Sequence, residues 1–300
     1  MNLEDIGFYT LSNKRALSSS EHTPLQRCEI VLTSRCNFSC PYCRRVGGQM
    51  SFDDACRCLD LWICDGLKNV RFSGGEPTLW PKLEDLVSRA RAGGVERIAL
   101  STNGSAPLDM YLSLIACGID DFSISLDACC SSMGKIMSGG NDKWDHVVRN
   151  IAELSKRVYT TLGIVLTDDN VDSIWDIIAL GERLGVADIR PIPTIPLTLS
   201  GYSRFPILNY RLSGGRIRGL RLGDCVTCRL ALDDMAVCDN KHFPCVIYMR
   251  EGGAPIGDVD DSMRGKRAEW VHTHNSLNDP ICSANCLDVC REYNNVASQR

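Results

Sequence analysis

The sequence predicts an α/β fold, in which six strands form a partial (β/α)6 barrel, open on one side, and a small cysteine-rich module follows. Three observations support this. Short segments rich in Val, Ile and Leu alternate with amphipathic segments over residues 28–196. The alternation stops after Pro196, and cysteines are concentrated beyond residue 222. Six consecutive strand–helix units favour a parallel sheet with right-handed crossovers.

The expected strands are short and apolar, as buried parallel strands are. They cover residues 28–34, 69–75, 97–104, 121–128, 160–166 and 187–193. Helices are expected at residues 51–66, 81–92, 107–117, 142–157 and 171–184. The first helix opens on Ser51 with an acidic first turn, and the second begins with Pro81 and ends before Gly93, which is the usual asymmetry of helix ends.

Four regions are expected along the chain: an N-terminal extension at 1–27, the barrel at 28–196, a Gly- and Arg-rich linker at 197–221, and the cysteine-rich module at 222–300. No Asp or Glu occurs between residues 198 and 223, whereas five arginines do: Arg204, Arg211, Arg216, Arg218 and Arg221. Arginine forks suit phosphate or carboxylate. The alternative is a solvated loop, or arginines that offset the negative charge of metal-bound thiolates.

The composition favours a cytoplasmic protein. The chain has 300 residues and a net charge of −4, and it contains no apolar run near the length of a membrane span. Its N-terminus lacks the basic and apolar regions of a secretory signal. In a reducing compartment its 17 cysteines indicate metal ligands rather than disulfides. We therefore expect no membrane partner, and we see no clear signal for nucleic-acid binding.

Cys36, Cys40 and Cys43 lie in the segment TSRCNFSCPYC with the spacing C-x3-C-x2-C. Three thiolates this close together can hold three irons of a [4Fe–4S] cluster and leave the fourth iron without a protein ligand. Such an iron is open to a further ligand. A zinc knuckle is the alternative.

Small polar residues and glycines follow the next three expected strands. They are Ser73-Gly74-Gly75-Glu76-Pro77, Ser101-Thr102-Asn103-Gly104 and Ser125-Leu126-Asp127. Ligands of parallel βα arrays collect at the carboxyl ends of the strands. Adjacent glycines allow a close backbone approach, and Glu76 supplies an acceptor for an ammonium group.

The cysteine triad, followed one βα unit later by Gly-Gly-Glu-Pro, resembles the signature of radical SAM enzymes, and residues 28–196 look like their core. The resemblance implies that the triad carries a [4Fe–4S] cluster to which S-adenosylmethionine binds. It also implies contacts to S-adenosylmethionine from Tyr42 near the adenine, from Gly74, Gly75 and Glu76 at the methionine amino group, and from polar strand ends near the ribose: Thr102, Asn103, Ser125 and Asp127.

The chemistry implied by this resemblance is one-electron reduction of S-adenosylmethionine to methionine and a 5′-deoxyadenosyl radical. The radical then abstracts a hydrogen atom from a substrate. A reductase of the flavodoxin or ferredoxin type is the implied electron donor.

Seven further cysteines lie in the C-terminal module: Cys225, Cys228, Cys238, Cys245, Cys282, Cys286 and Cys290. The pattern from Cys228 to Cys245 resembles the SPASM or twitch extension of radical SAM enzymes, with Asn240 in place of the usual glycine. The resemblance implies at least one auxiliary iron–sulfur cluster. Its expected ligands are Cys225, Cys228, Cys245 and one of the last three cysteines.

Two alternatives remain open for these cysteines. Four of them could hold structural zinc instead of an iron–sulfur cluster. Cys238 fits a core thiol better than a metal ligand or a hydrogen-atom donor to a substrate radical.

The chain also resembles the molybdopterin-precursor (GTP) cyclases, and Arg71 and Thr102 match nucleotide-contacting positions of that family. Three features argue against GTP. Glu29 stands where the family has a basic residue, the expected strand 160–166 has no lysine, and the chain ends Ala-Ser-Gln-Arg instead of Gly-Gly. A carboxylate would repel a triphosphate.

We therefore expect a small polar, anionic substrate that is nucleotide- or sugar-like. A peptide maturase that forms a crosslink, thioether or epimer is the second hypothesis. The 27 residues before the first strand are few for a peptide-recognition domain. A non-catalytic zinc-binding protein is the third hypothesis.

Overall fold

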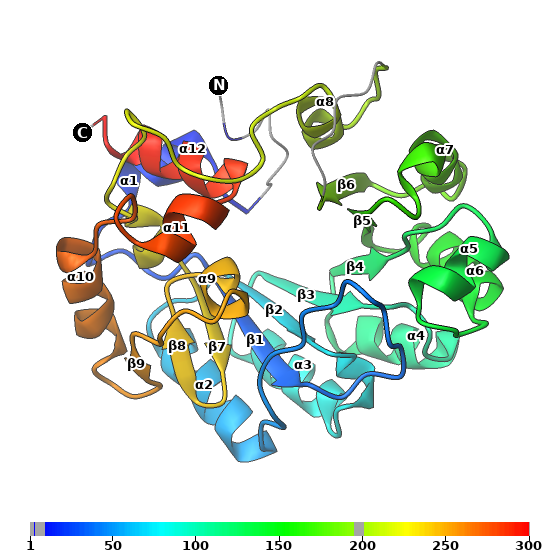
Figure 1. Cartoon of the computed structure of the whole chain (residues 1–300). Helices are drawn as coiled ribbons and strands as arrows, with labels where there is room; N and C mark the ends of the chain where they lie inside the picture. The colour runs from blue at the N-terminus through cyan, green and yellow to red at the C-terminus, as the bar shows by residue number, and fades with distance from the viewer. Residues whose placement is uncertain (1–2, 4–9, 195–200, 300) are drawn as a thin grey trace.

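The computed structural model describes residue 3 and residues 10–194 and 201–299. Its centre is one curved sheet with the strand order β6-β5-β4-β3-β2-β1-β7-β8-β9 (Figure 1). The first six strands are β1 (Arg27–Thr33), β2 (Asn69–Gly74), β3 (Arg97–Thr102), β4 (Asp121–Ser125), β5 (Tyr159–Leu166) and β6 (Asp188–Pro193). They are parallel to their neighbours, which confirms the expected partial barrel.

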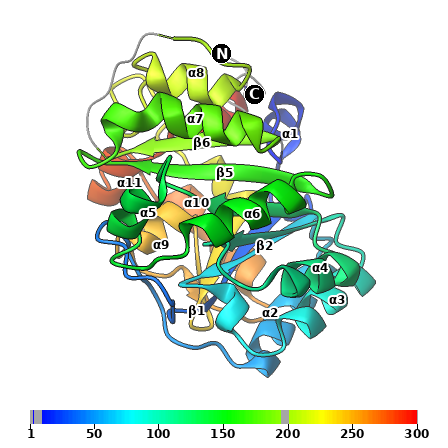
Figure 2. The same cartoon turned by 90° about the vertical axis from the view of Figure 1, so that its right-hand side faces the viewer.

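The helices that connect these strands cover the outer face of the sheet (Figure 2). They are α2 (Phe52–Cys64), α3 (Leu83–Ala92), α4 (Leu108–Cys117), α5 (Ser131–Met137), α6 (Trp144–Leu154) and α7 (Ile174–Arg183). All are near their expected positions except α5, which the sequence did not predict. The Ser51 side chain caps α2 by accepting from the Asp54 N–H. A short 3₁₀ turn, Val171–Ser173, precedes α7 and explains its later start.

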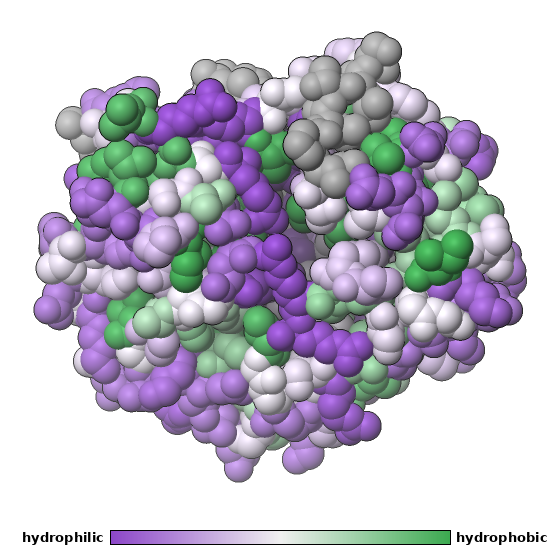
Figure 3. All heavy atoms as spheres, in the orientation of Figure 1, coloured by the Kyte–Doolittle hydropathy of each residue, from purple (hydrophilic) through white to green (hydrophobic). Residues whose placement is uncertain are grey.

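Alternate residues of each strand face opposite sides of the sheet. One set packs under the helices and forms the main core, as the fully buried Ile30, Phe72, Leu100 and Ile124 show. Several residues between them are polar and partly exposed, among them Glu29, Arg71 and Ser101. The barrel interior is therefore polar, and Figure 3 shows the molecule hollowed near its centre, with hydrophilic side chains beside the hollow.

The C-terminal segment adds three strands to the same sheet: β7 (Asp234–Cys238), β8 (Lys241–Phe243) and β9 (Gly257–Asp258). Strand β7 pairs in parallel with β1, and β8 and β9 continue antiparallel. The cysteine-rich segment is thus joined to the barrel by hydrogen bonds between strands. The sequence did not predict this pairing, and the expected region boundaries stay a prediction.

The remaining helices gather at the β1 side of the molecule (Figure 1). They are α1 (Asn13–Ser18), α9 (Val246–Arg250), α10 (Met263–Thr273), α11 (Pro280–Asn285) and α12 (Asp288–Ala297). Helix α8 (Pro206–Leu212) lies in the expected linker. Leu11 and Ala16 of the N-terminal region pack with Tyr293 and Ala297 of α12. None of the described helices is long and apolar enough to cross a membrane.

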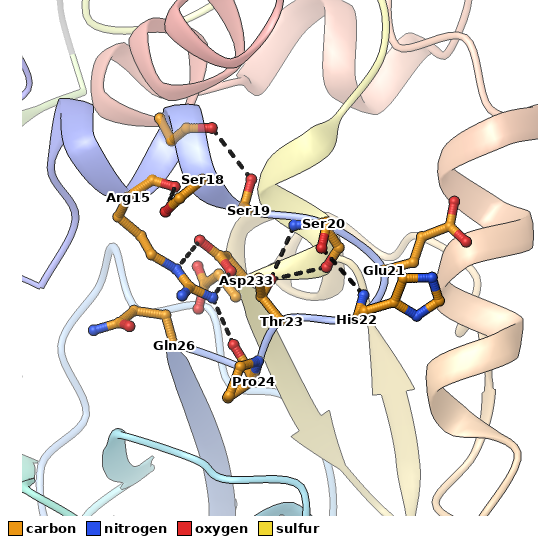
Figure 4. Close-up of polar contacts among 12 residues, drawn as sticks. Arg15, Ser18, Ser19, Ser20, Glu21, His22, Thr23, Pro24, Gln26 and Asp233 are labelled. Atoms are coloured by element: carbon orange, nitrogen blue, oxygen red, sulfur yellow. Dashed lines mark hydrogen bonds and ion pairs between the residues drawn. The ribbon is translucent and has the colours of Figure 1, made fainter. Parts of the chain in front are cut away.

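Asp233 joins three distant parts of the chain. Its buried carboxylate forms an ion pair with Arg15 and accepts a hydrogen bond from the Tyr293 hydroxyl. Its backbone carbonyl accepts from the N–H groups of Gln26 and Arg27 at 2.9 and 3.0 Å. Figure 4 shows Arg15 directed at this carboxylate. The N-terminal segment is therefore fixed against both β1 and α12.

Candidate functional site

The cysteine triad lies in the loop that follows β1. The loop is tied to its surroundings by the Ser34 N–H, which donates to the Gly48 carbonyl at 2.7 Å, and by the Ser39 N–H, which donates to the Ser138 carbonyl at 3.0 Å. Gly139 lies so close that an added Cβ would be 2.2 Å from the Ser39 carbonyl oxygen. Only a residue without a side chain fits at this position, so residues 138 and 139 help to shape the triad loop.

The thiol of Cys36 already receives two hydrogen-bond donors, the Phe38 N–H at 3.3 Å and Asn103 Nδ2 at 3.8 Å. Donors directed at sulfur suit a thiolate ligand. Burial raises the pKa of the Cys36 thiol, and it raises the pKa of Cys40 to about 11. Deprotonation of these thiols at neutral pH therefore depends on a bound metal.

The triad sulfurs do not all lie within 4.8 Å of one another. Four thiolates around one zinc ion at ~2.3 Å would stand about 3.8 Å apart. A cluster separates its ligands more widely, because each thiolate binds a different iron. The assignment of the triad to an iron–sulfur cluster rather than to a zinc knuckle stays a prediction.

Gly74 and Gly75 bring the end of β2 against the start of the triad loop. An added Cβ on Gly74, whose φ is 146°, would lie 2.3 Å from the Thr33 carbonyl oxygen, and one on Gly75 would lie 2.3 Å from that of Arg35. The Gly75 and Glu76 N–H groups donate to these carbonyls at 2.6 and 2.8 Å. The glycines are therefore required by the chain's own packing, and their contact with S-adenosylmethionine stays a prediction.

Glu76 is fully buried and links the ends of β2 and β3. Its Oε1 accepts from the Thr78 N–H, the Thr78 hydroxyl and the Thr102 hydroxyl, at 3.1, 2.7 and 2.8 Å, and its Oε2 accepts from the Asn103 N–H at 2.7 Å. Burial raises its pKa, and these donors oppose that shift. The carboxylate thus orients Thr102 and Asn103, and its expected contact with an ammonium group stays a prediction.

Tyr42 and Asp127 lie together at the end of β4. The Tyr42 hydroxyl donates to Asp127 Oδ2, while Asp127 Oδ1 accepts from the Val165 N–H at 2.6 Å. The Asp127 carbonyl accepts from Asn170 Nδ2 at 2.8 Å. Burial raises the Asp127 pKa to about 6. Tyr42 therefore anchors the triad loop, a role that the sequence analysis did not assign to it.

Ser125, by contrast, is exposed at the end of β4. It is the only cofactor-binding candidate among the described residues with that degree of exposure. The sequence analysis missed Asn37, whose Oδ1 accepts from Asn103 Nδ2 at 2.8 Å, and Asn170. No local pattern could have identified either asparagine, because both act through contacts between residues that are distant in the sequence.

Four cysteines of the C-terminal segment form one group, which we call the auxiliary thiols: Cys228, Cys245, Cys282 and Cys286. Each is half-buried, and burial raises the pKa of each thiol, to about 12 for Cys245. Nearby thiols add to the rise for three of them: Cys228 acts on Cys245, Cys228 and Cys245 act on Cys286, and all three other members act on Cys282.

Two cysteines lie beside this group. Cys290 is buried near Cys286 and Cys245, which add to the burial-driven rise of its pKa. The Cys225 sulfur instead contacts the Thr227 carbonyl at 3.4 Å. The assignments of Cys225 and Cys290 as metal ligands stay predictions.

Polar groups lie beside three of the auxiliary thiols. Asn294 Nδ2 donates to the Cys228 sulfur at 3.6 Å, the Tyr248 N–H donates to that of Cys245 at 3.4 Å, and His274 Nε2 lies 3.6 Å from that of Cys282. His274, Asp279 and Cys282 each offer one ligand atom, and these atoms lie within 4.8 Å of one another. The donors suit metal-bound thiolates, and the auxiliary iron–sulfur cluster stays a prediction.

Cys238 packs against the triad loop. It is buried with Val31, Ala236 and Met249, and an added Cβ on Gly47 would lie 2.4 Å from its sulfur. Burial raises its pKa to about 12. This environment is that of a core thiol, and a hydrogen-donor role stays a prediction.

The linker arginines make contacts within the protein. Arg211 forms a buried bidentate ion pair with Asp288 at 2.8 Å and donates to the Pro191 carbonyl at 2.8 Å. Arg216 pairs with Asp224 at 2.8 Å. These two arginines are therefore held by aspartates of the protein itself, which neither the anion-binding hypothesis nor its alternatives predicted.

Arg71 has a different environment inside the barrel. Its Nη1 donates to the Ser101 hydroxyl at 3.0 Å, and no carboxylate among the described residues lies within 4 Å of its guanidinium. Burial lowers its pKa to about 10; Glu29 opposes this shift, and nearby arginines add to it. Glu29, on the neighbouring strand, accepts from Ser73 at 2.7 Å and from Arg250 at 3.4 Å. Arg71 therefore offers a half-buried cation in the polar interior.

Comparisons with known proteins identify relatives that match part of this chain. A probable GTP 3′,8-cyclase of Metallosphaera sedula is 30% identical over 190 residues, which are 61% of this chain and 59% of that protein. A probable GTP 3′,8-cyclase of Pyrococcus abyssi is 32% identical over 168 residues, 54% of each chain. The chain thus spans less than two thirds of the length of these relatives.

Solved structures share the fold at low sequence identity. Streptococcus suis SuiB bound to the precursor peptide SuiA has a TM-score of 0.64 at 14% identity, covering 90% of this chain and 71% of SuiB. The enzyme anSMEcpe with bound AdoMet has a TM-score of 0.63 at 19% identity, covering 85% and 83%. The family model of the Radical SAM superfamily matches residues 30–181, just over half of the chain. The chain therefore belongs to the Radical SAM superfamily.

Proposed function

We propose that this chain is a radical SAM enzyme that acts on a small polar metabolite that carries an acidic group. A bound [4Fe–4S] cluster and S-adenosylmethionine would supply one-electron cleavage to methionine and a 5′-deoxyadenosyl radical. Transfer of a hydrogen atom to that radical gives 5′-deoxyadenosine and a substrate radical. An auxiliary iron–sulfur cluster would accept the remaining electron or hold the substrate. The electron for cleavage comes from a reductase of the flavodoxin or ferredoxin type.

The observation that carries the substrate class is the position of Arg71. Its guanidinium lies in the polar interior, held by Ser101, without a carboxylate among the described residues within ion-pair distance. An arginine fork binds carboxylate or phosphate by two parallel hydrogen bonds. A substrate anion at this position would provide the negatively charged partner that an arginine shielded from water requires.

The triad loop supports the placement of S-adenosylmethionine. Cys36, Tyr42 and Glu76 are linked by hydrogen bonds to the ends of β3 and β4. Because the carboxyl ends of parallel strands meet at one edge of the sheet, these contacts support a cluster position at the barrel mouth. We infer that Cys36, Cys40 and Cys43 hold the cluster there, while Gly74, Gly75 and Ser125 contact the cofactor.

The four auxiliary thiols support an auxiliary cluster. They are half-buried and lie near one another, Asn294 and Tyr248 donate to two of their sulfurs, and His274 Nε2 lies beside a third. We infer that Cys228, Cys245, Cys282 and Cys286 are its ligands.

GTP fits this site less well than a smaller anion does. Glu29 lies on the strand next to Arg71, where the expected basic contact would be, and it is bound to Ser73 and Arg250. Its charge would oppose a triphosphate nearby. A relative's name, probable GTP 3′,8-cyclase, still makes GTP the first defined compound to test.

A peptide maturase is the second candidate. One observation favours it: the fold resembles that of SuiB, which was solved with its precursor peptide, over 90% of this chain. A peptide could present an acidic side chain to Arg71, so the same residue would serve both candidates.

The test measures 5′-deoxyadenosine after anaerobic reconstitution, with dithionite and S-adenosylmethionine. Metabolites from a cell extract are separated by anion exchange, and GTP is tested as a single compound. We expect the anion-retained small molecules to stimulate the reaction. Cys36→Ala should abolish it, and Arg71→Gln should keep unstimulated cleavage but lose the stimulation.

Two outcomes contradict the proposal. Stimulation by peptides alone would favour the maturase, and stimulation that Arg71→Gln leaves unchanged would remove Arg71 from substrate binding. Arg221→Gln, a linker substitution at an exposed arginine, is the matched control and should behave like the wild type.

A further inference from the structure

We propose that His274 is a positioning residue of the auxiliary cluster, and that its Nε2–H donates a hydrogen bond to the thiolate of Cys282 and raises the reduction potential of the cluster. This inference rests on the auxiliary cluster of the proposed function. Nothing in the cysteine spacing indicates a role for this histidine, which lies eight residues before Cys282.

The geometry fixes the histidine ring beside the sulfur. His274 Nε2 lies 3.6 Å from Cys282 Sγ. The ring stacks on Trp270, with centroids 4.0 Å apart and planes at 16°, and meets the ring of Tyr248 edge-on at 6.1 Å. The backbone N–H of His274 also donates to the Trp270 carbonyl at 2.8 Å, at the end of α10. Two aromatic contacts therefore leave the ring little freedom to turn away.

Asp279 supports the arrangement from the other side. Its Oδ1 caps α11 by accepting from the N–H groups of Ile281 and Cys282, both at 2.8 Å. Its Oδ2 accepts from the Tyr248 hydroxyl at 3.1 Å and lies 4.0 Å from His274 Nε2. A carboxylate near Nε2 favours the tautomer that carries a proton there. Asp279 thus positions both the sulfur and its donor.

The four cluster ligands, rather than the distance, indicate a hydrogen bond, because His274, Asp279 and Cys282 also lie close enough together to share one metal ion. Cys282 belongs to the four auxiliary thiols, which can supply all four ligands of one [4Fe–4S] cluster. A donor at 3.6 Å from sulfur then lies outside the ligand shell, in the place where partners of metal ligands usually lie.

The expected effect follows from charge. Reduction adds an electron to the cluster, and a hydrogen bond to a ligand thiolate stabilises the more negative, reduced state. Loss of the donor should therefore shift the potential to a more negative value. A replacement side chain that keeps an N–H donor to the Cys282 thiolate should shift the potential less.

The experiment uses the full-length chain with Cys36, Cys40 and Cys43 replaced by alanine, so that only the auxiliary cluster is measured. Midpoint potentials are determined by redox titration monitored by electron paramagnetic resonance, alongside iron and zinc analysis. We expect His274→Leu to keep about four irons per chain and to titrate at a more negative potential. His274→Gln, which retains an N–H donor, should lie between. His272→Leu, two residues earlier and exposed, should leave the potential unchanged.

A measurement on this triad-free chain with histidine labelled by ¹⁵N does not depend on folding of a His274 variant. Weak ¹⁵N coupling to the reduced cluster supports the hydrogen bond, whereas strong coupling identifies His274 as an iron ligand and overturns it. An unchanged potential in His274→Leu with full iron content also overturns it. The proposal is also overturned if the chain binds one zinc ion and His274→Leu does not bind it. In that case His274, Asp279 and Cys282 would form a separate cation site. Absence of iron from the triad-free chain would instead show that the auxiliary cluster itself is wrong.

Discussion

The hydroxyl of Tyr42 donates a hydrogen bond to the buried carboxylate of Asp127, and this contact ties the cysteine triad loop to the end of β4. The two residues are separated by 85 positions in the sequence. The loop that holds three predicted cluster ligands therefore takes part of its shape from a strand two βα units beyond the Gly-Gly-Glu-Pro segment.

Tyr42→Phe should destabilise the protein, because the Asp127 carboxylate would lose a donor while remaining buried. A hydrogen bond to a charged group contributes about 1.5–3 kcal/mol, so a loss of that order is expected. Urea unfolding of the reconstituted enzyme measures it. Tyr202→Phe alters an exposed tyrosine and should leave stability unchanged. Equal stability of Tyr42→Phe and wild type would show that the contact contributes little.

Gly75→Ala should prevent normal loading of the triad cluster. Its Cβ would lie 2.3 Å from the Arg35 carbonyl oxygen, next to Cys36, so the loop must shift. We expect iron content to fall by about four per chain, the content of one cluster, and 5′-deoxyadenosine formation to be lost. Gly265→Ala is the control, since nothing lies within 4 Å of its added Cβ. Full iron content in Gly75→Ala would refute the steric argument.

Arg211→Ala should be strongly destabilising, because it leaves the buried Asp288 carboxylate without its bidentate partner. Removing one member of a buried ion pair costs about 3–5 kcal/mol. The free energy of unfolding in urea provides the measurement, and Arg221→Ala in the same linker should change it little. A small effect of Arg211→Ala would return this arginine to the candidates for anion binding.

Asp121→Asn should alter the pH dependence of stability. Burial raises the pKa of this carboxyl from 3.8 to about 7, outweighing the attraction of Arg190. The folded protein therefore holds the Asp121 proton more tightly than the unfolded chain does. The resulting stabilisation is present at low pH and is lost as the pH rises from about 4 to about 7. The variant should therefore gain stability relative to wild type between pH 5.5 and 7.5. Asp53→Asn, on the first turn of α2, is the control, and a pH-independent difference would contradict the raised pKa.

The amino-acid sequence predicted the barrel well, because its signals are local. Apolar strands, the Ser51 cap and the glycines that end helices depend on near neighbours, and the expected helices at 51–66 and 81–92 agree with α2 and α3 to within a few residues. Helix α5 was missed because its seven residues are too short to show a period. Helix α8 was missed because its segment reads as Gly- and Arg-rich.

The sequence could not predict how the C-terminal cysteines group. Spacing indicated Cys225, Cys228, Cys245 and one of the last three cysteines, and this ligand set stays a prediction. The structure places Cys228 and Cys245 near Cys282 and Cys286. Spacing could not show that α11, with Cys282 within it and Cys286 at its C-terminal end, lies beside the other two thiols. Such groupings depend on packing between segments that are distant in the chain, and a motif records only the neighbours within it.

The sequence by itself determined the cysteine triad, the Gly-Gly-Glu-Pro segment and the order of strands and helices, since all of these are set by residues close together in the chain. Only the tertiary structure decided that β7 pairs with β1, that Arg211 is held by Asp288 while Arg71 faces the interior without such a partner among the described residues, and that His274 reaches Cys282. The physical reason is that burial and pairing are properties of neighbours in space, which folding brings together from distant positions.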